Sequence, residues 1–395
     1  MENPIIACDV SKGRSHIQGF MGLSKPFCNP FEVQHLRSDL VKLKQLAESL
    51  RRQTGRDPVF VFEYTGIYHE CIAKYVQEIG LKSYAISPLE SAKVRKSSIR
   101  VTKTDSKDCL NIATVYYSRN IREFINGNDD VKALSRRKRD LRCVLIRQKC
   151  IYHRYLDLIW PCFDEKFGTD SKSSRRIILS YLHPDKLKRS NVKSIANHLL
   201  NYCYLGQTRA ISLAQKAKEF ASDCISGVNK ESEYVNALSE ILNDLIKTEE
   251  TIENINEQME FLLRKNPYYR LLQTIPGFGK NILLQVMGEL GDFSRFQTAK
   301  QFVAYCGLDP SILQSGNNDG KHYSITRKGS EIIRSSLYLA VSQMLSKHKD
   351  NQITRFYQKK KSSGLSHKVA AVASCRKLAC CVFGMLHNGT CFETI

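Results

Sequence analysis

Four acidic residues in the N-terminal part of the chain have the types and spacing of a metal-binding site. Asp9 ends a first apolar run, Glu63 directly follows a second, and Asp105 and Asp108 lie three residues apart. If the runs are strands and Asp105 begins a helix, strand ends and one helix face could bring all four carboxylates together. Such acids would repel one another unless a cation neutralised them, and Mg²⁺ prefers oxygen ligands. The pattern predicts a site for one or two Mg²⁺ ions that assists an in-line displacement at a phosphate.

A purely structural role is the alternative for each acid. An Asp after a strand often caps a turn, and acids in the first turn of a helix interact favourably with its dipole. Convergence in one pocket would distinguish the two interpretations.

Ser315 is a candidate nucleophile near the C-terminal end of the chain. It precedes Gly316 in a polar, glycine-containing loop, and Lys321, Arg327 and Lys328 follow closely in the sequence. A hydroxyl that attacks a phosphodiester must be exposed, and neighbouring cations would hold the phosphate oxygens. A serine in an ordinary turn is the alternative.

The first hundred residues contain the elements that would position the acids. Apolar runs predict strands at Ile5–Val10, His16–Phe20, Val59–Phe62 and Leu81–Ile86. Helical spacing covers Phe31–Arg52 and the segment from Gly66 to Ile79. Strands that alternate with helices predict an α/β layer fold, in which Asp9 and Glu63 emerge at strand ends.

Two long helices are predicted in the middle of the chain, a basic one over 131–159 and an acidic one over 238–262. Both have apolar residues at alternating three- and four-residue steps, in the second from Leu238 to Leu262, which predicts an antiparallel coiled coil within one chain or between two. The candidates for nucleic-acid contact on the first helix are Arg136, Arg137, Lys138, Arg139 and Arg142, with a merely solvated face as the alternative. No function follows for residues 160–230.

The last 130 residues predict mainly helices separated by glycine turns. Ile275–Lys280 has the pattern of a helix-hairpin-helix turn, in which the following helix N-terminus and Lys280 can hold a phosphate. An ordinary tight turn is the alternative. We expect three domains: an α/β catalytic domain over 1–125, a helical coiled-coil region over 126–265, and a mainly α domain over 266–395.

The composition fits a protein that binds nucleic acid inside the cell. Lys and Arg number 60 against 39 Asp and Glu, so the formal charge is +21, as expected of a protein that neutralises phosphates. Fourteen cysteines without a Cys-x-x-Cys pair argue against a disulfide framework or a zinc site. No signal peptide or apolar segment long enough to span a bilayer is recognisable. We expect a reduced, cytoplasmic, nucleoid-associated bacterial protein.

Several segments resemble a known family. Ala7–Lys12, Phe62–Tyr68 and Lys103–Asp108 are similar to the three N-terminal blocks of the DEDD insertion-sequence transposases, the insertion-sequence one-ten family, and of the related Piv-type DNA invertases. Tyr305–Pro310, Gln314–Lys321 and Ser324–Gly329 are similar to the C-terminal transposase domain of that family. The blocks follow the family order.

The resemblance implies a RuvC-like, ribonuclease-H-type fold, metal binding by Asp9, Glu63, Asp105 and Asp108, and a catalytic serine at Ser315. Two residues depart from the family pattern: Cys109 stands where alanine is usual, and Gln314 where the first serine of Ser-Ser-Gly is usual. The resemblance also implies a homodimer or homotetramer, in which carboxylates of one subunit meet the serine of another. Its further partners would be donor and target DNA and a non-coding bridge RNA that pairs with both.

We therefore expect a transposase or recombinase of a mobile element that cuts and rejoins DNA through a phosphoserine intermediate. One alternative is a RuvC-like nuclease that hydrolyses DNA with water and leaves Ser315 structural. Others are a Piv-type invertase that needs no guide RNA, and a degenerate protein that only binds nucleic acid.

Overall fold

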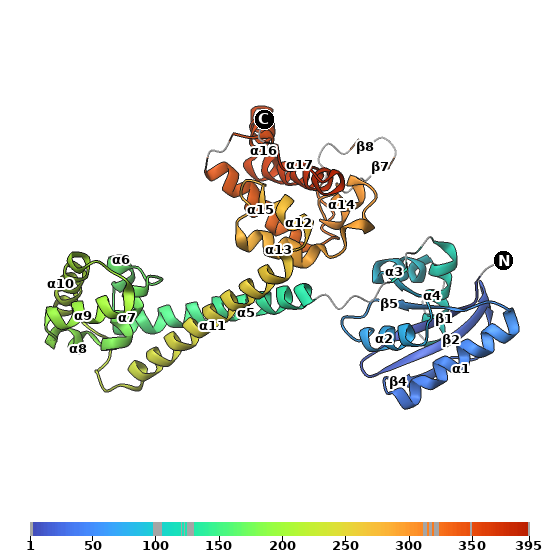
Figure 1. Ribbon diagram of the computed structural model, residues 1–395, viewed down its shortest axis with the longest axis horizontal. Coiled ribbons are helices and arrows are strands. Elements are labelled where there is room, and N and C mark those ends of the chain that lie inside the picture. The colour runs from blue at the N-terminus through green and yellow to red at the C-terminus, as the bar shows by residue number, and fades with distance from the viewer. Residues whose placement is uncertain are drawn as a thin grey trace. The chain divides into compact units, whose positions relative to one another are not determined.

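The computed structural model describes residues 3–97, 105–119, 121, 123–124, 130–310, 314–315, 318–319, 324–347 and 350–393. They belong to two compact units, residues 1–128 and residues 129–395, and each is described by itself (Figure 1). The second unit thus contains both of the regions predicted after residue 125, and a domain boundary at residue 265 stays a prediction.

The first unit is built around a mixed six-stranded sheet in the order β3-β2-β1-β5-β6, with β4 paired to β2. β1 is antiparallel to β2 and parallel to β5, and β5 is parallel to β6. The strands are β1 Ile5–Val10, β2 Arg14–Gly22, β3 Lys25–Pro26, β4 Phe31–Gln34, β5 Val59–Glu63 and β6 Ser83–Ile86. The helices are α1 Arg37–Thr54, α2 Glu70–Glu78, α3 Pro88–Ser97 and α4 Asp105–Ser118. All four predicted strands are present.

Helices bury both faces of the sheet. Ile6 and Cys8 of β1 belong to a core shared with α1 and α2, whereas Ile5 and Ala7 belong to a core shared with α4. This two-sided burial explains why β1 is a nearly continuous apolar run rather than an alternating one. The mixed sheet with helices on both faces is consistent with the expected ribonuclease-H-type fold.

The prediction of a single helix over Phe31–Arg52 is wrong for its first residues. Phe31–Gln34 is a strand that pairs with the first residues of β2, Arg14 to Ile17, and α1 begins only at Arg37. The backbone of Gln34 donates a 2.6 Å hydrogen bond to Asp39, which closes the turn between strand and helix. Pairing of this segment with β2 outweighed its helical spacing, because contacts with other strands often override the local preference of a strand.

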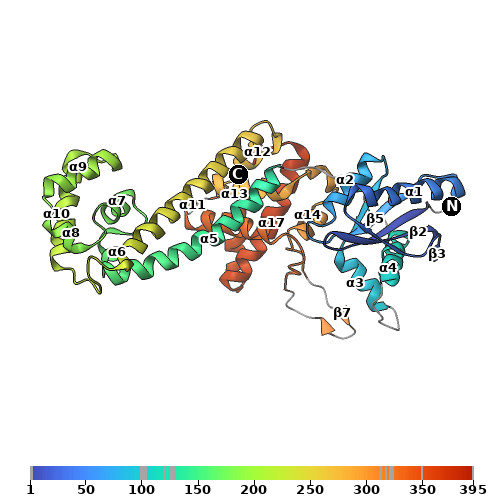
Figure 2. The same cartoon turned by 90° about the horizontal axis from the view of Figure 1, so that it is seen from below.

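Two long helices, α5 (Asp130–Ile159) and α11 (Glu233–Leu263), lie at the centre of the second unit. They pack against each other within one chain and run in opposite directions (Figure 2). The buried residues of α11 include Leu238, Leu245 and Ile252, as predicted. At its end Leu263 is buried and Leu262 is 44% exposed, so the predicted seam is wrong there. Coiled-coil geometry as such stays a prediction.

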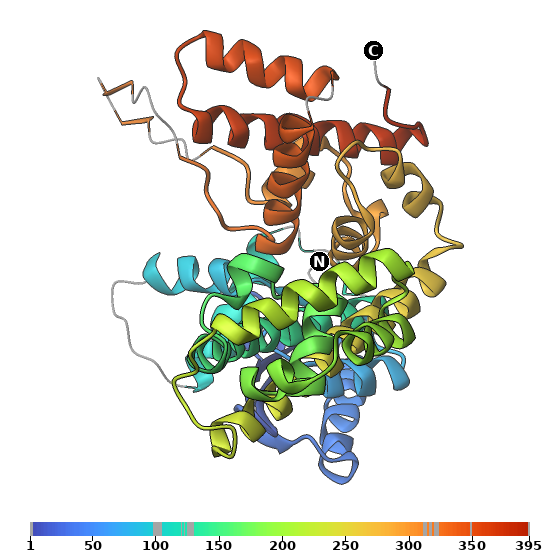
Figure 3. The ribbon, with the colours of Figure 1, turned by 90° about the vertical axis from the view of Figure 1, so that its left-hand side faces the viewer.

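A helical bundle at one end of this pair comprises residues 160–230, and we call it the distal bundle. Its helices, green in Figure 3, are α6 Phe163–Phe167, α7 Lys172–Tyr181, α8 Pro184–Arg189, α9 Val192–Cys203 and α10 Gln207–Asp223. They enclose a core that includes Trp160, Phe163 and Ile178. The segment without a predicted function is therefore a folded part of the protein.

The C-terminal elements pack at the other end of the two long helices. They are α12 Pro267–Gln273, α13 Lys280–Leu290, the 3₁₀ turn η1 Phe293–Arg295, α14 Ala299–Tyr305, β7 Gln314–Ser315, β8 Asn318–Asp319, α15 Glu331–Ser346, α16 Gln352–Ser362 and α17 His367–Asn388. Their core also takes in Leu134 of α5 and Met259 of α11. The long helices therefore contribute to the two largest cores of the second unit.

Among the described residues, α17 is long and apolar enough to cross a membrane by length and composition. This corrects the expectation that no apolar segment reaches that length. Half of its most apolar stretch is buried, and Leu378 and Val382 lie in the C-terminal core. α17 is thus accounted for as a core helix of this unit. The fourteen cysteines are all unpaired.

Candidate functional site

Asp9, Glu63 and Asp108 line one pocket of about 250 Å³ in the first unit. The parallel neighbours β1 and β5 supply the first two residues, and α4, which packs on both strands, supplies Asp108. All three side chains are partly buried, and the apolar Val10 and Ile112 complete part of the wall. Three of the four predicted acids therefore come together, which independent turn-capping roles would not require.

The other polar residues of the pocket are neutral and offer oxygen atoms. They are Ser11, Thr65, Ser91 and Asn111. A set of carboxylate, hydroxyl and amide oxygens fits a hard cation such as Mg²⁺, which also keeps several waters when bound. Among the side chains that the structure describes, no three from His, Cys, Asp and Glu lie close enough to form a complete metal site. Asp105 begins α4 one turn before Asp108, and its side chain lies outside the described part.

Cys109 fixes α4 against the sheet beside Asp108. The residue is fully buried, and its thiol donates to the backbone carbonyl of His16 at 3.4 Å. A small side chain fits this contact between helix and strand, so the departure from alanine leaves the position of Asp108 intact.

His35 connects the segments that follow the two acidic strand ends. Its Nε2 lies 2.8 Å from the hydroxyl of Ser15, at the start of β2, and its Nδ1 lies 3.2 Å from the thiol of Cys71, in the first turn of α2. Its backbone N–H donates to the carbonyl of Gly13 at 3.0 Å. Burial lowers the pKa of His35, so the ring is neutral at pH 7 and can donate on one side and accept on the other. The link holds the hairpin after Asp9 against the helix that follows Glu63.

Ser315 lies in a short two-stranded ribbon of the second unit. β7 pairs antiparallel with β8, with Ser315 opposite Asn318, and the side chain of Ser315 lies outside the described part. At the base of the ribbon Pro310 pairs with Ile325, and the hydroxyl of Thr326 donates to the carboxylate of Asp309. These contacts hold together the two segments that lead into and out of the ribbon.

Two glycine-containing segments, one with Gly307 and one with Gly329, pack tightly against each other. A Cβ atom added at Gly329 would lie 2.2 Å from the carbonyl oxygen of Tyr305, so only glycine fits there. The next residue, Ser330, donates its backbone N–H to the same carbonyl at 2.6 Å, and Arg334 donates to the carbonyl of Cys306 at 3.4 Å. These contacts join the segment before Ser315 to the segment after it.

Comparison with known proteins places these two sites in one family. Residues 6–161, which include all four acids, match the DEDD transposase family of IS110 type, and residues 269–358, which include Ser315, match the Transposase IS116/IS110/IS902 family. The chain belongs to the IS110 family of transposases. Residues 162–268 lie outside both matches.

The relatives of this IS110-family chain include both transposition and inversion proteins. It is 30% identical to the pilin gene-inverting protein of Moraxella lacunata over 148 residues, 36% of this chain and 46% of that protein. It is 22% identical over 303 residues to an IS116 insertion-element protein of Streptomyces clavuligerus, covering 73% of this chain and 72% of the relative. It is 25% identical over 154 residues to the IS1111A transposase of Coxiella burnetii, 37% of this chain and 41% of the relative. The match to the inverting protein thus spans less than half of that protein's length.

The predicted nucleic-acid contacts of this IS110-family chain fall into two groups. Arg136, Arg137 and Arg139 on α5 and Arg327 and Lys328 after the ribbon are exposed, whereas Lys321 lies outside the described residues. The remaining candidates have partners within the protein. Lys138 is buried and donates to Asn281, Arg142 donates to Gln285, and Lys280 binds Glu253 and Glu260.

The prediction that Lys138 contacts nucleic acid is wrong, because its ammonium group faces α13 rather than solvent.

The turn at 275–280 joins α12 to α13 and buries Ile275 and Phe278. Gly277 has φ +84°, and a Cβ there would lie 2.6 Å from the carbonyl oxygen of Ala340. Phosphate binding by this turn stays a prediction.

Sequence reasoning missed the neutral residues of the acidic pocket. Asn111 was detectable, since it follows Asp108 by three positions and so lies on the same helix face. Ser11 and Thr65 were detectable as the second residue after each strand-end acid. Ser91 had no signal, because it comes from α3, whose place beside α4 follows only from the fold.

Proposed function

We propose that the protein is a transposase that cuts and rejoins the DNA of a mobile element, with Ser315 as nucleophile and the acidic pocket as its partner. The observation that supports this most strongly is the meeting of Asp9, Glu63 and Asp108 in one pocket, from three separate sequence motifs. The two family matches contain the acids and the serine respectively. Both groups would act on one phosphodiester in the assembly with DNA.

The chemistry is a pair of transesterifications. The Ser315 hydroxyl attacks the phosphorus, a bond from phosphorus to a deoxyribose oxygen breaks, and that oxygen leaves with a proton. The hydroxyl of another strand then attacks the phosphoserine, and Ser315 regains its proton. Each step makes one phosphate ester bond and breaks one, so no external energy source is needed.

The acidic residues would hold one or two Mg²⁺ ions, with Asp9, Glu63, Asp108 and Asp105 as ligands. Bound there, Mg²⁺ would offset the negative charge that develops on the phosphate oxygens. Arg327 and Lys328, exposed after the ribbon, would hold the same phosphate or its neighbour.

Sequence recognition would come mainly from a bridge RNA that pairs with donor and target DNA, while the protein contacts the nucleic-acid backbone and recognises the shape of the duplex. The exposed arginines Arg136, Arg137 and Arg139 of α5 suit those backbone contacts, since phosphate contacts need charge rather than base-specific geometry. Copurification of one defined RNA with the protein would support this part of the proposal, and recombination in its absence would favour inversion without a guide.

The decisive experiment looks for DNA covalently attached to the protein. The purified chain, its copurifying RNA and matched donor and target DNA are incubated with Mg²⁺, denatured and analysed by gel and mass spectrometry. We expect an adduct at Ser315 that is absent in Ser315→Ala and Asp9→Ala and retained in Ser324→Ala, a second serine of the same segment. Cleavage without an adduct, undiminished in Ser315→Ala, would show a hydrolytic nuclease instead.

A mixing experiment tests whether the two groups come from different subunits. Ser315→Ala and Asp9→Ala are each expected to be inactive alone. If one subunit supplies the acids and another the serine, the mixture regains part of the activity. A mixture as inactive as its components would place both groups in the same subunit.

A further inference from the structure

The distal bundle is a part of the protein for which the family matches offer no role, because residues 162–268 lie outside both of them. It has a core of its own, which includes Trp160, Phe163 and Leu199. A folded bundle at the end of two long helices presents surface that is not needed to complete the C-terminal core or the acidic pocket.

The charge of the bundle is unevenly distributed along its sequence. Residues 171–184 and 191–218 contain seven lysines and arginines and no aspartate or glutamate. These two segments supply α7, α9 and the first part of α10. Arg175 among them is mostly buried and paired with Glu249 and Asp170, whereas Lys172, Lys193, Arg209 and Lys216 are exposed. Surface that carries these exposed cations attracts anions, most strongly extended ones such as a phosphate backbone.

One corner of this surface carries a preorganised aromatic ring. The guanidinium of Arg176 on α7 lies over the ring of Tyr202 on α9, 3.4 Å from the ring centroid, yet Tyr202 remains 57% exposed. Stacking on one face fixes the ring and leaves much of it accessible to a second flat partner.

Tyr204 stands two residues further on, directly after the end of α9. It is 97% exposed and has φ +49°, a left-handed backbone conformation that is costly for a bulky residue. This conformation is also the one that ends α9, for which Tyr204 is the C-cap residue. A ring exposed to this extent is open to a flat partner from solvent.

The cations and the tyrosines share this corner. Lys172 and Arg176 both lie near Cys203, the residue between the two tyrosines: burial raises the pKa of its thiol, and the charges of Arg176 and Lys172 oppose that rise. Lys172 is itself exposed. Two positive charges and two accessible rings are therefore close together at the junction of α7 and α9.

We propose that this corner, made of Lys172, Arg176, Tyr202 and Tyr204, binds an unpaired stretch of nucleic acid. The tyrosine rings would stack on bases, and the two cations would pair with the phosphates between them. Paired bases hide their faces inside a helix, so rings that need an open base face select single strands, loops or bulges. The site would hold a second segment of nucleic acid away from the reacting phosphodiester, so it goes beyond the function proposed above and requires no cleavage.

The test is photo-cross-linking of the full-length protein to short oligonucleotides. A twelve-nucleotide uridine RNA with one 4-thiouridine and a thymidine DNA with one 4-thiothymidine are each irradiated with the protein, and cross-linked peptides are mapped by mass spectrometry. We expect cross-links to the peptide around Tyr202 and Tyr204, reduced about tenfold by Tyr204→Ala, since one stacked base contributes on the order of 1–3 kcal/mol. The exposed position of Tyr204 means that its removal leaves the fold intact, which circular dichroism can confirm.

Controls and opposing outcomes make the proposal falsifiable. Tyr234→Ala, which removes another half-exposed tyrosine at the start of α11, is expected to leave the cross-link unchanged, and so is Ser315→Ala. A stronger cross-link with RNA would identify a guide RNA as the unpaired strand that binds the corner. A stronger cross-link with DNA would identify a displaced DNA strand instead. The proposal is wrong if cross-links map only outside residues 160–230, or if Tyr204→Ala abolishes binding to phosphatidylglycerol vesicles but leaves oligonucleotide cross-links unchanged. Because no cleavage is measured, this result and the Ser315 adduct can fail independently.

Discussion

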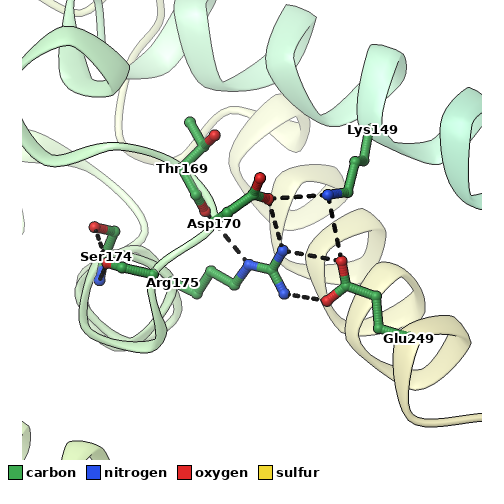
Figure 4. Close-up of polar contacts among 7 residues, drawn as sticks. Lys149, Thr169, Asp170, Ser174, Arg175 and Glu249 are labelled. Atoms are coloured by element: carbon green, nitrogen blue, oxygen red, sulfur yellow. Dashed lines mark hydrogen bonds and ion pairs between the residues drawn. The ribbon is translucent and has the colours of Figure 1, made fainter. Parts of the chain in front are cut away.

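The guanidinium of Arg175 and the carboxylate of Glu249 join α7 of the distal bundle to α11 through two hydrogen bonds, of which the one from Nη2 to Oε1 measures 3.2 Å (Figure 4). Arg175 also donates to Asp170 at 3.0 Å, and Lys149 of α5 reaches the carboxylates of both Asp170 and Glu249. Burial disfavours the charge on Glu249, but the bonds and charges of Arg175 and Lys149 outweigh it and hold its pKa below the ordinary value. Hydrogen bonds and ion pairs among these four charged groups thus connect the distal bundle to both long helices.

Removing Arg175 is expected to destabilise the protein substantially. The side chain of Arg175 is only 12% exposed, and loss of one partner leaves Glu249 partly buried without its main cation. We expect Arg175→Met to lower the free energy of unfolding by about 3 kcal/mol, measured by urea denaturation. Arg189→Met, an exposed arginine of α8, should change it by less than about 0.5 kcal/mol. A double-mutant cycle with Glu249→Leu that found no coupling would contradict this account.

Two helical glycines are expected to respond oppositely to alanine. At Gly288 of α13 an added Cβ would lie 2.5 Å from the Cβ of Ser135, so α13 can approach α5 only with glycine there. At Gly384 of α17 nothing lies within 4 Å of the added atom. Gly384→Ala should raise stability by about 1 kcal/mol through helix propensity, whereas Gly288→Ala should lower it. Thermal unfolding of the two variants checks this, and equal shifts would argue against close packing of α13 on α5.

The part of the site that the sequence predicted best is the part governed by local pattern. The apolar runs that end in Asp9 and precede Glu63 can be buried only as central strands, and parallel neighbours bring their ends together. Asp108 follows from helical spacing on α4. These three residues needed no knowledge of distant contacts beyond the pairing of two strands.

What the sequence could not reveal depends on contacts between separate elements of the fold. Phe31–Gln34 became a strand because β2 offered a free edge, and Ser91 joined the pocket because α3 packs beside α4. The sequence presents Lys138 as one more cation of a basic helix, yet its ammonium group donates a hydrogen bond to Asn281, 143 residues away. Burial of a charge is decided by the neighbour that covers it, and no periodicity encodes that neighbour.

The buried Lys138 should make stability depend on pH in the alkaline range. Burial, reinforced by the charge of Arg142, lowers its pKa to about 8, compared with about 10.4 in an unfolded chain. Between these values the unfolded state binds more protons than the folded state, so a rise in pH favours folding. The gain from this group approaches about 3 kcal/mol by pH 10.4, at about 1.4 kcal/mol per pKa unit.

Comparison of variants isolates that contribution from other groups that titrate in the same range. Relative to wild type, Lys138→Met should lack the increase in stability between about pH 8 and 10.4, as measured by urea midpoints at several pH values. Lys216→Met, which removes an exposed lysine of α10, should follow the wild-type curve. If Lys138→Met and wild type run parallel, Lys138 is not desolvated in the folded protein.

The acidic pocket should couple stability to divalent cations. Asp9, Glu63 and Asp108 repel one another in a partly buried space, so a bound cation stabilises the folded state by mass action. With free Mg²⁺ at about ten times its dissociation constant, the gain is about 1.4 kcal/mol, which appears as a rise of a few degrees in the unfolding temperature relative to EDTA. Asp108→Asn should reduce this rise, and Asp140→Asn, which alters an exposed carboxylate of α5, should not.

Asn111→Asp offers the sharper test, because it adds a carboxylate to the pocket and leaves Asp9, Glu63 and Asp108 in place. In EDTA the extra repulsion should lower the unfolding temperature below that of wild type. With Mg²⁺ the added ligand should enlarge the metal-dependent rise, so that the two proteins converge or cross. A variant that is destabilised equally with and without Mg²⁺ would mean that the three acids do not share a cation, and metal binding in this pocket would have to be abandoned.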